Sequence, residues 1–247
     1  MEPPVIYEPR TYRSFDKHER FKAFRVVIET SDLYVKAHSR LEKETEELIR
    51  KGRAQVEWAV AKRPEFLTSL VPVDEDPSDA PVVLRMIRAG KKAGTGPMAA
   101  VAGAIAEFVG RELCLLSPEV IVENGGDIFL NVQAPVVIGL YAGKSPFSGR
   151  VGLKVDATAI PMGICTSSAK VGPSLSLGSA DAATIVSPDV ALADAVATGL
   201  GNRIHRESDL KAAVEWALGV PGVVGALAIL GDKIAAQGDL ELVSIPE

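Results

Sequence analysis

The sequence predicts an α+β protein, and two observations lead to that expectation. Short runs of β-branched and bulky apolar residues come in pairs joined by turn-forming residues, which is typical of antiparallel hairpins. Two other segments, residues 98–106 and 190–200, have helical length and are apolar on nearly every side. Because such helices lack a polar face, both must be buried and closely packed.

Composition places the chain among ordinary globular proteins. It has 247 residues, of which 47% are hydrophobic and 24% charged, and a net charge of −5. That charge gives no overall basic field, so we expect no nucleic-acid partner. The two cysteines, Cys114 and Cys165, are too few for a disulfide framework or a thiolate zinc site, and their apolar or small neighbours are typical of buried thiols.

Targeting and membrane segments are not expected. The N-terminus lacks the basic region and following apolar region of a signal peptide. The longest clean apolar stretch, residues 220–230, is too short to span a bilayer and contains Pro221, Gly222 and Gly225. We therefore expect a cytoplasmic protein without membrane contact.

The first part of the chain is expected to form a hairpin and a long helix. Residues 24–28 and 33–37 are strand-like and are joined across Thr30-Ser31-Asp32. Ser39, with Glu42 three residues later, fits a capping box at a helix start, a cap that contributes about 1 kcal/mol.

A glycine-rich loop precedes the first of the two apolar helices. Gly94-Thr95-Gly96-Pro97 leads into residues 98–106, after a helix predicted from about residue 80 to residue 91. The backbone N–H groups at a helix N-terminus form a natural anion site. Taken alone the signal is weak, because many buried helices begin after glycine.

The central feature is the turn Glu123-Asn124-Gly125-Gly126-Asp127, which lies between two predicted strands, 120–122 and 128–130. Glycine lacks Cβ, so Gly125 and Gly126 permit a positive φ and let another group approach the backbone closely. Asp127 then projects a carboxylate from the start of the second strand. A plain hairpin with a Gly-Gly turn, which needs no ligand, fits this stretch equally well.

Three hydroxyl side chains, Thr166, Ser167 and Ser168, follow an apolar strand and precede a loop. Hydroxyls and backbone amides in such a loop can hold phosphate oxygens or a hydrated metal ion. A surface turn accounts for the same residues without a ligand. The strands around them are expected at residues 136–141, 151–155 and 181–187.

The second apolar helix carries two polar residues, Asp194 and Thr198, which share a face because they are four residues apart. Ser187-Pro188-Asp189 predicts its start, with proline at the first helical position. A buried carboxylate needs a cation, a strong donor or water, since unpaired burial carries a large desolvation penalty. The hard oxygens of this pair suit Mg²⁺. The competing interpretation is a structural ion pair of Asp194 with Arg203 or a lysine.

The C-terminal part is predicted to be scaffold. Ser208 is expected to cap a helix that runs to Leu218. Residues 223–230 and 233–236 then form a hairpin, and residues 240–245 form a last strand.

Taken together and in order, these motifs resemble the ApbE family, the FAD:protein FMN transferases. The matching pieces are Gly125-Gly126-Asp127, then Thr166-Ser167-Ser168, then residues 191–198 in the pattern Ala-x-Ala-Asp-Ala-x-Ala-Thr. Residues 94–107 are similar, more loosely, to the family's glycine-rich loop and helix. The last motif is the most specific, and the clear likeness covers about residues 93–202.

The resemblance implies an α+β fold with two mixed subdomains, in which antiparallel-rich sheets and buried helices surround a shared core. It implies one ApbE-like domain over residues 1–247, with a divergent N-terminal part (1–92), a motif-bearing core (93–205) and C-terminal helix and strands (206–247).

The resemblance also implies a site. Asn124, Gly125, Gly126, Asp127, Thr166, Ser167 and Ser168 would line a pocket for FAD or a related flavin nucleotide. Asp194 and Thr198 would ligate a Mg²⁺ ion that bridges the diphosphate.

Two departures from the family pattern bear on activity. The acidic residue and the lysine of the glycine-rich segment are missing, and Ser179-Ala180-Asp181-Ala182 stands in place of the family's His-x-x-Asp-Pro. Asp181 is the only nearby carboxylate left as a base. The leading function is a Mg²⁺-dependent enzyme acting on a small-molecule flavin or related nucleotide diphosphate, as a flavin transferase with an acceptor protein or as an FAD pyrophosphatase. The alternative is a non-catalytic flavin or nucleotide-binding protein that keeps the pocket.

Overall fold

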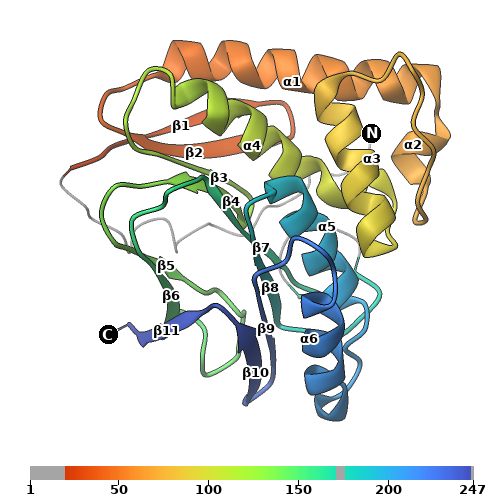
Figure 1. Cartoon of the computed structure of the whole chain (residues 1–247), viewed down its shortest axis with the longest axis vertical. Coiled ribbons are helices and arrows are strands. Elements are labelled where there is room, and N and C mark those ends of the chain that lie inside the picture. The colour runs from red at the N-terminus through yellow and green to blue at the C-terminus, as the bar shows by residue number, and fades with distance from the viewer. Residues whose placement is uncertain (1–19, 171–175, 246–247) are drawn as a thin grey trace.

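The fold is built on one large antiparallel sheet, covered by helices on one face and by a small sheet on the other. The computed structural model describes residues 20–170 and 176–245. Figure 1 shows the helices along the top and right of the molecule and the small sheet at the lower left. The α+β class, the antiparallel sheets and the buried helices predicted from the sequence are confirmed.

The large sheet has eight strands, and each neighbouring pair is antiparallel. Its strands, in spatial order, are β1 (Lys22–Ile28), β2 (Ser31–Ala37), β3 (Val120–Asn124), β4 (Asp127–Asn131), β7 (Met162–Ser167), β8 (Ala182–Ser187), β9 (Gly225–Leu230) and β10 (Lys233–Gly238). The small sheet has the order β11 (Glu241–Ser244), β6 (Val151–Val155) and β5 (Val136–Gly139).

The helices cover one face of the large sheet, and the most apolar of them is also the most buried. Both apolar segments form helices, and in α5 every residue except Thr198 is buried. The helices are α1 (Glu42–Lys62), α2 (Glu65–Thr68), α3 (Pro81–Ala93), α4 (Val101–Leu113), α5 (Val190–Gly201) and α6 (Leu210–Leu218), with short 3₁₀ turns at Pro97–Ala100 and Glu207–Asp209. No helix in the described ranges combines the length and the apolar character that crossing a membrane requires.

Two hydrophobic cores follow from the alternation of side chains along the strands. On β8, Ala183 and Ile185 pack into the core beneath the helices, while Ala182 and Val186 pack into the core beneath the small sheet. Any side chain on these strands can therefore be assigned to the helix face or to the small-sheet face of the large sheet.

Four local predictions need correction, and one is the Ser208 cap: Ser208 lies within the 3₁₀ turn Glu207–Asp209, and α6 begins at Leu210 without a side-chain cap. The first hairpin turns at Glu29-Thr30 instead of residues 30–32, and Glu29 has a φ of 53°. The predicted Ser39 cap is wrong: α1 begins at Glu42 after Leu41, whose side chain is buried in the core, and no side chain caps the helix. Burial of Leu41 takes priority over the capping box.

The predicted start of α5 also needs correction. Pro188 lies outside the helix, and Asp189 is the N-cap residue, with its Oδ1 accepting from the Leu192 N–H at 3.0 Å. An aspartate in this role satisfies a backbone donor that the helix itself cannot pair. Proline therefore precedes the cap here and does not occupy the first helical turn.

Candidate functional site

The Gly-Gly turn joins β3 to β4 and is held against β7. Gly125 and Gly126 have φ values of 73° and 112°, which side chains other than glycine rarely adopt, and Asn124 pairs directly with Asp127. The Thr166 N–H donates to the Gly126 carbonyl at 3.2 Å. A Cβ added at Gly126 would lie 3.3 Å from the Thr166 carbonyl oxygen, so the turn packs closely on β7.

Three side chains near this turn point to the helix face of the sheet. The Asn124 amide Nδ2 donates to the Ala102 carbonyl on α4 at 3.1 Å. Asp127 is directly opposite Cys165 across the β4–β7 pair, and both side chains are buried. The turn thus presents an amide and a carboxyl group to the start of α4 and to α5.

Asp194 approaches the same place from α5. Its Oδ2 accepts from the Gly103 N–H at 2.8 Å, and the N–H of Ala102 also hydrogen bonds to this carboxylate. These donors belong to the second and third residues of α4, whose own cap residue, Ala100, has no capping side chain. Asp194 therefore caps α4 from a neighbouring helix, and the anion at this helix start is supplied by the protein itself.

The helix packing at this point depends on Gly103. A Cβ there would lie 2.7 Å from the Asp194 Cβ and 2.6 Å from the Val190 carbonyl oxygen. A glycine inside a buried helix costs up to about 1 kcal/mol relative to alanine, and close helix contact is a reason to accept that cost. Sequence reasoning missed Ala102 and Gly103 as site residues, although the glycine within the apolar helix was the available signal.

Asp127 and Asp194 form a buried pair of like charges. Burial raises the pKa of Asp127 well above its usual value, and the charge of Asp194 raises it further. Burial also raises the pKa of Asp194 to about 7, against the opposing effect of the Gly103 and Ala102 N–H groups. Two carboxylates in this setting resist full ionisation unless a proton or a cation joins them.

Cys165 is a structural neighbour of the pair. Burial and the nearby carboxylates raise the pKa of the Cys165 thiol well above its usual value. The Cys165 Sγ donates to the Val190 carbonyl at 3.5 Å. A neutral thiol held in this way is a poor nucleophile, in agreement with the buried role expected from the sequence.

The three predicted hydroxyl residues do not point in one direction: Thr166 and Ser167 lie on opposite faces of β7, and Ser168 follows the strand. The Thr166 hydroxyl bonds the Thr184 hydroxyl at 2.9 Å, and strand alternation places both on the small-sheet face. Ser167 follows on the helix face, where its Oγ lies 3.9 Å from a Cβ built at Gly201. The Ser168 Oγ accepts from the Lys170 N–H at 3.1 Å. Thr166 therefore contacts the turn through its backbone only. The Thr166 and Ser168 hydroxyl groups bond to Thr184 and Lys170, and neither bonds to Asp194.

Asp181 is held by other groups. Its Oδ1 lies 2.6 Å from the Lys170 Nζ, and its Oδ2 accepts from the Gly231 N–H at 2.6 Å. Asp181 is also absent from the charges that shift the pKa of Asp127 or Asp194. The geometry gives this carboxylate a structural task at the start of β8, and a role as a base would require its release from both partners.

Thr198 and Arg203 complete the account of α5. Thr198 lies one turn beyond Asp194 and is only half-buried, and within the described residues its hydroxyl has no hydrogen bond. Arg203 donates to the Gly199 carbonyl at 2.7 Å and stacks 3.4 Å from the centre of the Trp216 ring. Arg203 is thus engaged elsewhere, and the alternative of an Asp194–Arg203 ion pair is not observed.

The donor set fits Mg²⁺ better than a softer metal. The described residues contain no cluster of three or more histidine, cysteine or acidic side chains arranged to hold a metal ion. Asp127, Asp194 and Thr198 instead offer hard oxygen ligands from two carboxylates and a hydroxyl. Mg²⁺ is commonly bound by one or two carboxylates, with substrate phosphates and water completing its coordination.

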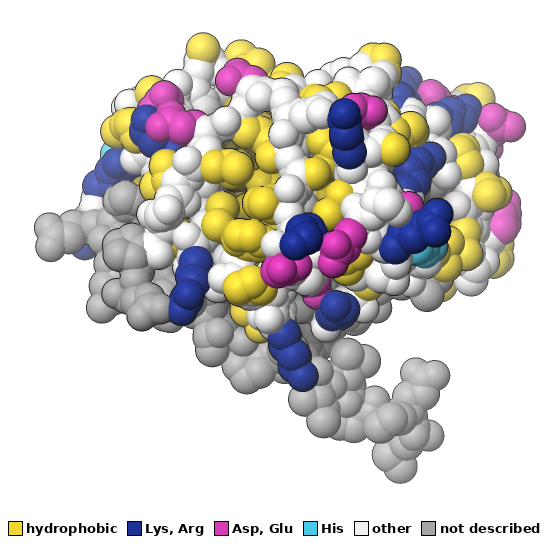
Figure 2. Space-filling view, turned by 90° about the horizontal axis from the view of Figure 1, so that it is seen from below, with side chains coloured by type: hydrophobic (Ala, Val, Ile, Leu, Met, Phe, Trp, Pro, Cys, Tyr) yellow, Lys and Arg dark blue, Asp and Glu magenta, His cyan; other side chains and the backbone are white. Residues whose placement is uncertain are grey.

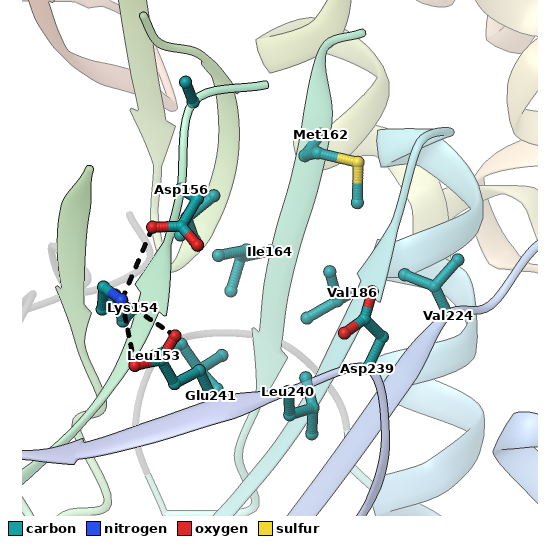
Figure 3. A pocket seen from close by; sticks show the side chains of 12 residues that line it. Leu153, Lys154, Asp156, Met162, Ile164, Val186, Val224, Asp239, Leu240 and Glu241 are labelled. Atoms are coloured by element: carbon teal, nitrogen blue, oxygen red, sulfur yellow. Dashed lines mark hydrogen bonds and ion pairs between the residues drawn. The ribbon is translucent and has the colours of Figure 1, made fainter. Parts of the chain in front are cut away.

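A cavity of about 250 Å³ lies elsewhere, between the two sheets. Figure 3 shows its apolar floor, which includes Ile164 and Val186, and the Lys154 ammonium group between Asp156 and Glu241 at its rim. Neither Asp127 nor Asp194 lines it, because both lie on the helix face of the large sheet. This cavity is therefore separate from the candidate site, which lies on the opposite face of the large sheet.

The surface charges are mixed. Figure 2 shows one face on which hydrophobic side chains gather in the middle and side chains of both charge signs surround them. The coloured part of that face has no continuous basic area, in keeping with the net charge of −5.

An α+β fold with a Gly-Gly-Asp turn facing an aspartate on a buried helix defines the class of this protein as ApbE-like. The family model described as "AbpE bacteria" matches residues 13–220, and the chain belongs to this family.

Several of its curated relatives are archaeal. A UPF0280 protein of Methanocella arvoryzae is 47% identical over 194 residues, which are 78% of each chain. A UPF0280 protein of Methanocaldococcus jannaschii is 40% identical over 223 residues, which are 87% of this chain and 90% of the relative. The resemblance predicted from the motifs is confirmed, within the UPF0280 branch.

Solved ApbE structures share the fold. The ApbE protein of Thermotoga maritima superposes with a TM-score of 0.57 at 14% identity, covering 87% of this chain and 96% of that one. The apo flavinyl transferase ApbE of Pseudomonas stutzeri gives a TM-score of 0.54 at 13% identity, covering 88% and 94%. At these identities the likeness establishes the fold alone.

Proposed function

We propose that this protein binds a flavin nucleotide, or a related nucleotide diphosphate, as its Mg²⁺ complex. The observation that carries the proposal is the buried Asp127–Asp194 pair, because two adjacent carboxylates in a low-dielectric site favour a divalent cation. Asp194 and Thr198 would hold the ion, and Asp127 would supply the second negative charge. When bound, Mg²⁺ would neutralise negative charge on the diphosphate.

The turn supports a nucleotide as the ligand. Gly125 and Gly126 carry no side chains, so the turn would present only backbone atoms to a diphosphate that approaches it. The structural neighbours include the flavinyl transferase ApbE of Pseudomonas stutzeri and the flavin transferase ApbE of Vibrio cholerae, which favours a flavin over other nucleotides as the ligand. A ligand at this turn would lie next to the carboxylate pair.

We further propose that binding is retained and that FMN transfer to a protein acceptor is inefficient. In the described part of the chain, neither Asp127 nor Asp194 forms an ion pair with a lysine, an arginine or a histidine. Asp181, the base expected from the sequence, is already paired with Lys170. Activation of an acceptor hydroxyl by a general base is typically worth 10²- to 10⁴-fold in rate, roughly the loss expected here. A non-catalytic nucleotide-binding protein is therefore the second candidate.

Calorimetric titration with FAD, in the presence and absence of Mg²⁺, tests the binding proposal. Wild-type protein is expected to bind FAD in a Mg²⁺-dependent manner, and Asp194→Asn to lose that dependence. Asp232→Asn makes the same chemical change on an exposed turn and serves as the matched control. Wild-type protein with no affinity for any flavin or adenine nucleotide would refute the proposal.

A separate assay addresses catalysis. The protein is incubated with FAD, Mg²⁺ and the acceptor protein of an active flavin transferase, and the acceptor is examined for covalent flavin. Efficient attachment would show that transfer is retained. FAD binding without attachment would favour the binding protein.

A further inference from the structure

Glu107 is a buried charged residue that the site described so far does not use. It lies on α4 and is fully buried. Its Oε1 is 2.9 Å from an Arg85 nitrogen on α3 and 2.7 Å from an Arg111 nitrogen one turn further along α4. Its Oε2 accepts from the Val190 N–H at 3.2 Å. One carboxylate thus joins three helices.

The Val190 contact has a clear electrostatic reason. Val190 is the first residue of α5, and its N–H has no acceptor within that helix. Asp189 satisfies a different donor, the Leu192 N–H. A carboxylate near a helix N-terminus is also favoured by the helix dipole. The half-exposed Arg85 and Arg111 stabilise the charge of Glu107 without removing this interaction.

The Glu107–Val190 bond fixes the register of α5 on α4. Gly103, one turn before Glu107, donates to Asp194, one turn after Val190. The two helices are therefore antiparallel and joined at two points that are one turn apart on each. The Cys165 Sγ holds Val190 from the β7 side through its carbonyl. Val190 is thus held by α4 through its N–H and by β7 through its carbonyl.

Building on the proposed function, we propose that Glu107 is a positioning residue for the cation site. By holding the first N–H of α5, it places the Asp194 carboxylate against the first turn of α4 and opposite Asp127. Glu107 itself touches neither the cation nor the nucleotide.

Three variants separate position from charge. Glu107→Ala removes the acceptor for Val190. Glu107→Gln keeps an acceptor oxygen of the same reach and removes the charge. Arg111→Gln removes one ion pair and leaves the Val190 contact intact. Two readouts are taken for each: hydrogen exchange of the Gly103 amide by NMR, and affinity for Mg²⁺ in the presence of FAD.

Glu107→Ala is expected to speed exchange at Gly103 and to weaken Mg²⁺ binding about 10- to 100-fold, the usual range for residues that orient metal ligands. Glu107→Gln is expected to restore most of both readouts, and Arg111→Gln to leave both unchanged. Rescue by glutamine distinguishes positioning from a general loss of stability. If Glu107→Ala does not fold, Glu107→Asp takes its place, because it keeps the charge but withdraws the carboxylate by one methylene.

The outcomes are separable from those of the proposed function. A folded Glu107→Ala protein with unchanged Gly103 exchange and unchanged Mg²⁺ affinity would overturn the positioning role. Wild-type protein that binds neither Mg²⁺ nor FAD would overturn the proposed function, while exchange at Gly103 would still decide whether Glu107 sets the helix register.

Discussion

The Asn124 side chain is hydrogen bonded to the Ala102 carbonyl at 3.1 Å, and this bond ties the Gly-Gly turn to the first turn of α4. This bond matters because the N–H groups of Ala102 and Gly103 donate hydrogen bonds to the Asp194 carboxylate. The turn, the start of α4 and α5 are therefore one connected unit.

Asn124→Ala should lower the free energy of unfolding by about 1–2 kcal/mol, since it removes a largely buried hydrogen bond and leaves the Ala102 carbonyl less satisfied. Urea denaturation measures this change. Asn131→Ala is the matched control, because Asn131 makes a similar but exposed bond to the Pro118 carbonyl at the other end of the same hairpin. An equal loss in both variants would contradict a special role for the buried bond.

Gly103→Ala should destabilise the protein although alanine favours helices. The new Cβ would lie within 2.7 Å of Val190 and Asp194 atoms, and overpacking of this kind typically costs about 1–3 kcal/mol. Gly201→Ala, at the end of α5, meets no atom closer than 3.6 Å and should be neutral or slightly stabilising. Thermal unfolding of the two variants gives the comparison, and a stabilised Gly103→Ala protein would show that α4 and α5 are loosely packed.

The metal-free protein should lose stability as pH rises from about 5 to about 7. The pKa of Asp194 is about 7 in the folded state against an ordinary value of 3.8, so the folded state binds more protons between these values. Stability then falls with pH by about 1.4 kcal/mol per pH unit for one such proton. Acids whose pKa is lowered, such as Asp209, act in the opposite direction, and their effect is confined to more acidic pH.

Urea denaturation at several pH values without divalent cations measures this slope. Asp194→Asn should flatten it, and saturating Mg²⁺ should restore stability near pH 7.5 because the cation binds the ionised pair. A wild-type profile that stays flat between pH 5 and 7 would mean that the pair ionises at ordinary pH in the folded state.

Asp181→Asn should reduce stability by about 1–3 kcal/mol, because it removes the ion pair between the buried Asp181 carboxylate and the exposed Lys170 and weakens the hydrogen bond from the Gly231 N–H. FAD affinity should stay within about twofold of wild type, a change of less than about 0.5 kcal/mol. If the variant is as stable as wild type but loses turnover in a flavin-transfer assay, Asp181 is a base after all.

The sequence identified the residues with the strongest local signals. Adjacent glycines before Asp127 and a lone carboxylate in an apolar helix each violate an ordinary pattern, so Asp127 and Asp194 could be selected without coordinates. The orientation of the Thr166 and Ser168 side chains could not be predicted from the sequence. A shift of one residue in strand register moves a side chain to the opposite face of the sheet. Glu107 could not be identified from the sequence either, because its role depends on a hydrogen bond from the backbone N–H of Val190, an apolar residue that is distant in the sequence.

The topology of the large sheet has a consequence for the order of folding. The four helices α1 to α4 lie between β2 and β3 in the chain, yet Ala37 pairs with Val120 in the sheet. Bringing β2 and β3 together closes a long segment of chain, and the entropy of that segment is lost before the strand pairing can stabilise the product. Topologies of this kind therefore fold slowly. The β1–β2 and β3–β4 hairpins can each form locally, whereas the Asp127–Asp194 pair needs β4, β7 and α5 together. Titration of that pair in a refolding experiment would therefore report the assembly of β4, β7 and α5, and not the formation of either hairpin alone.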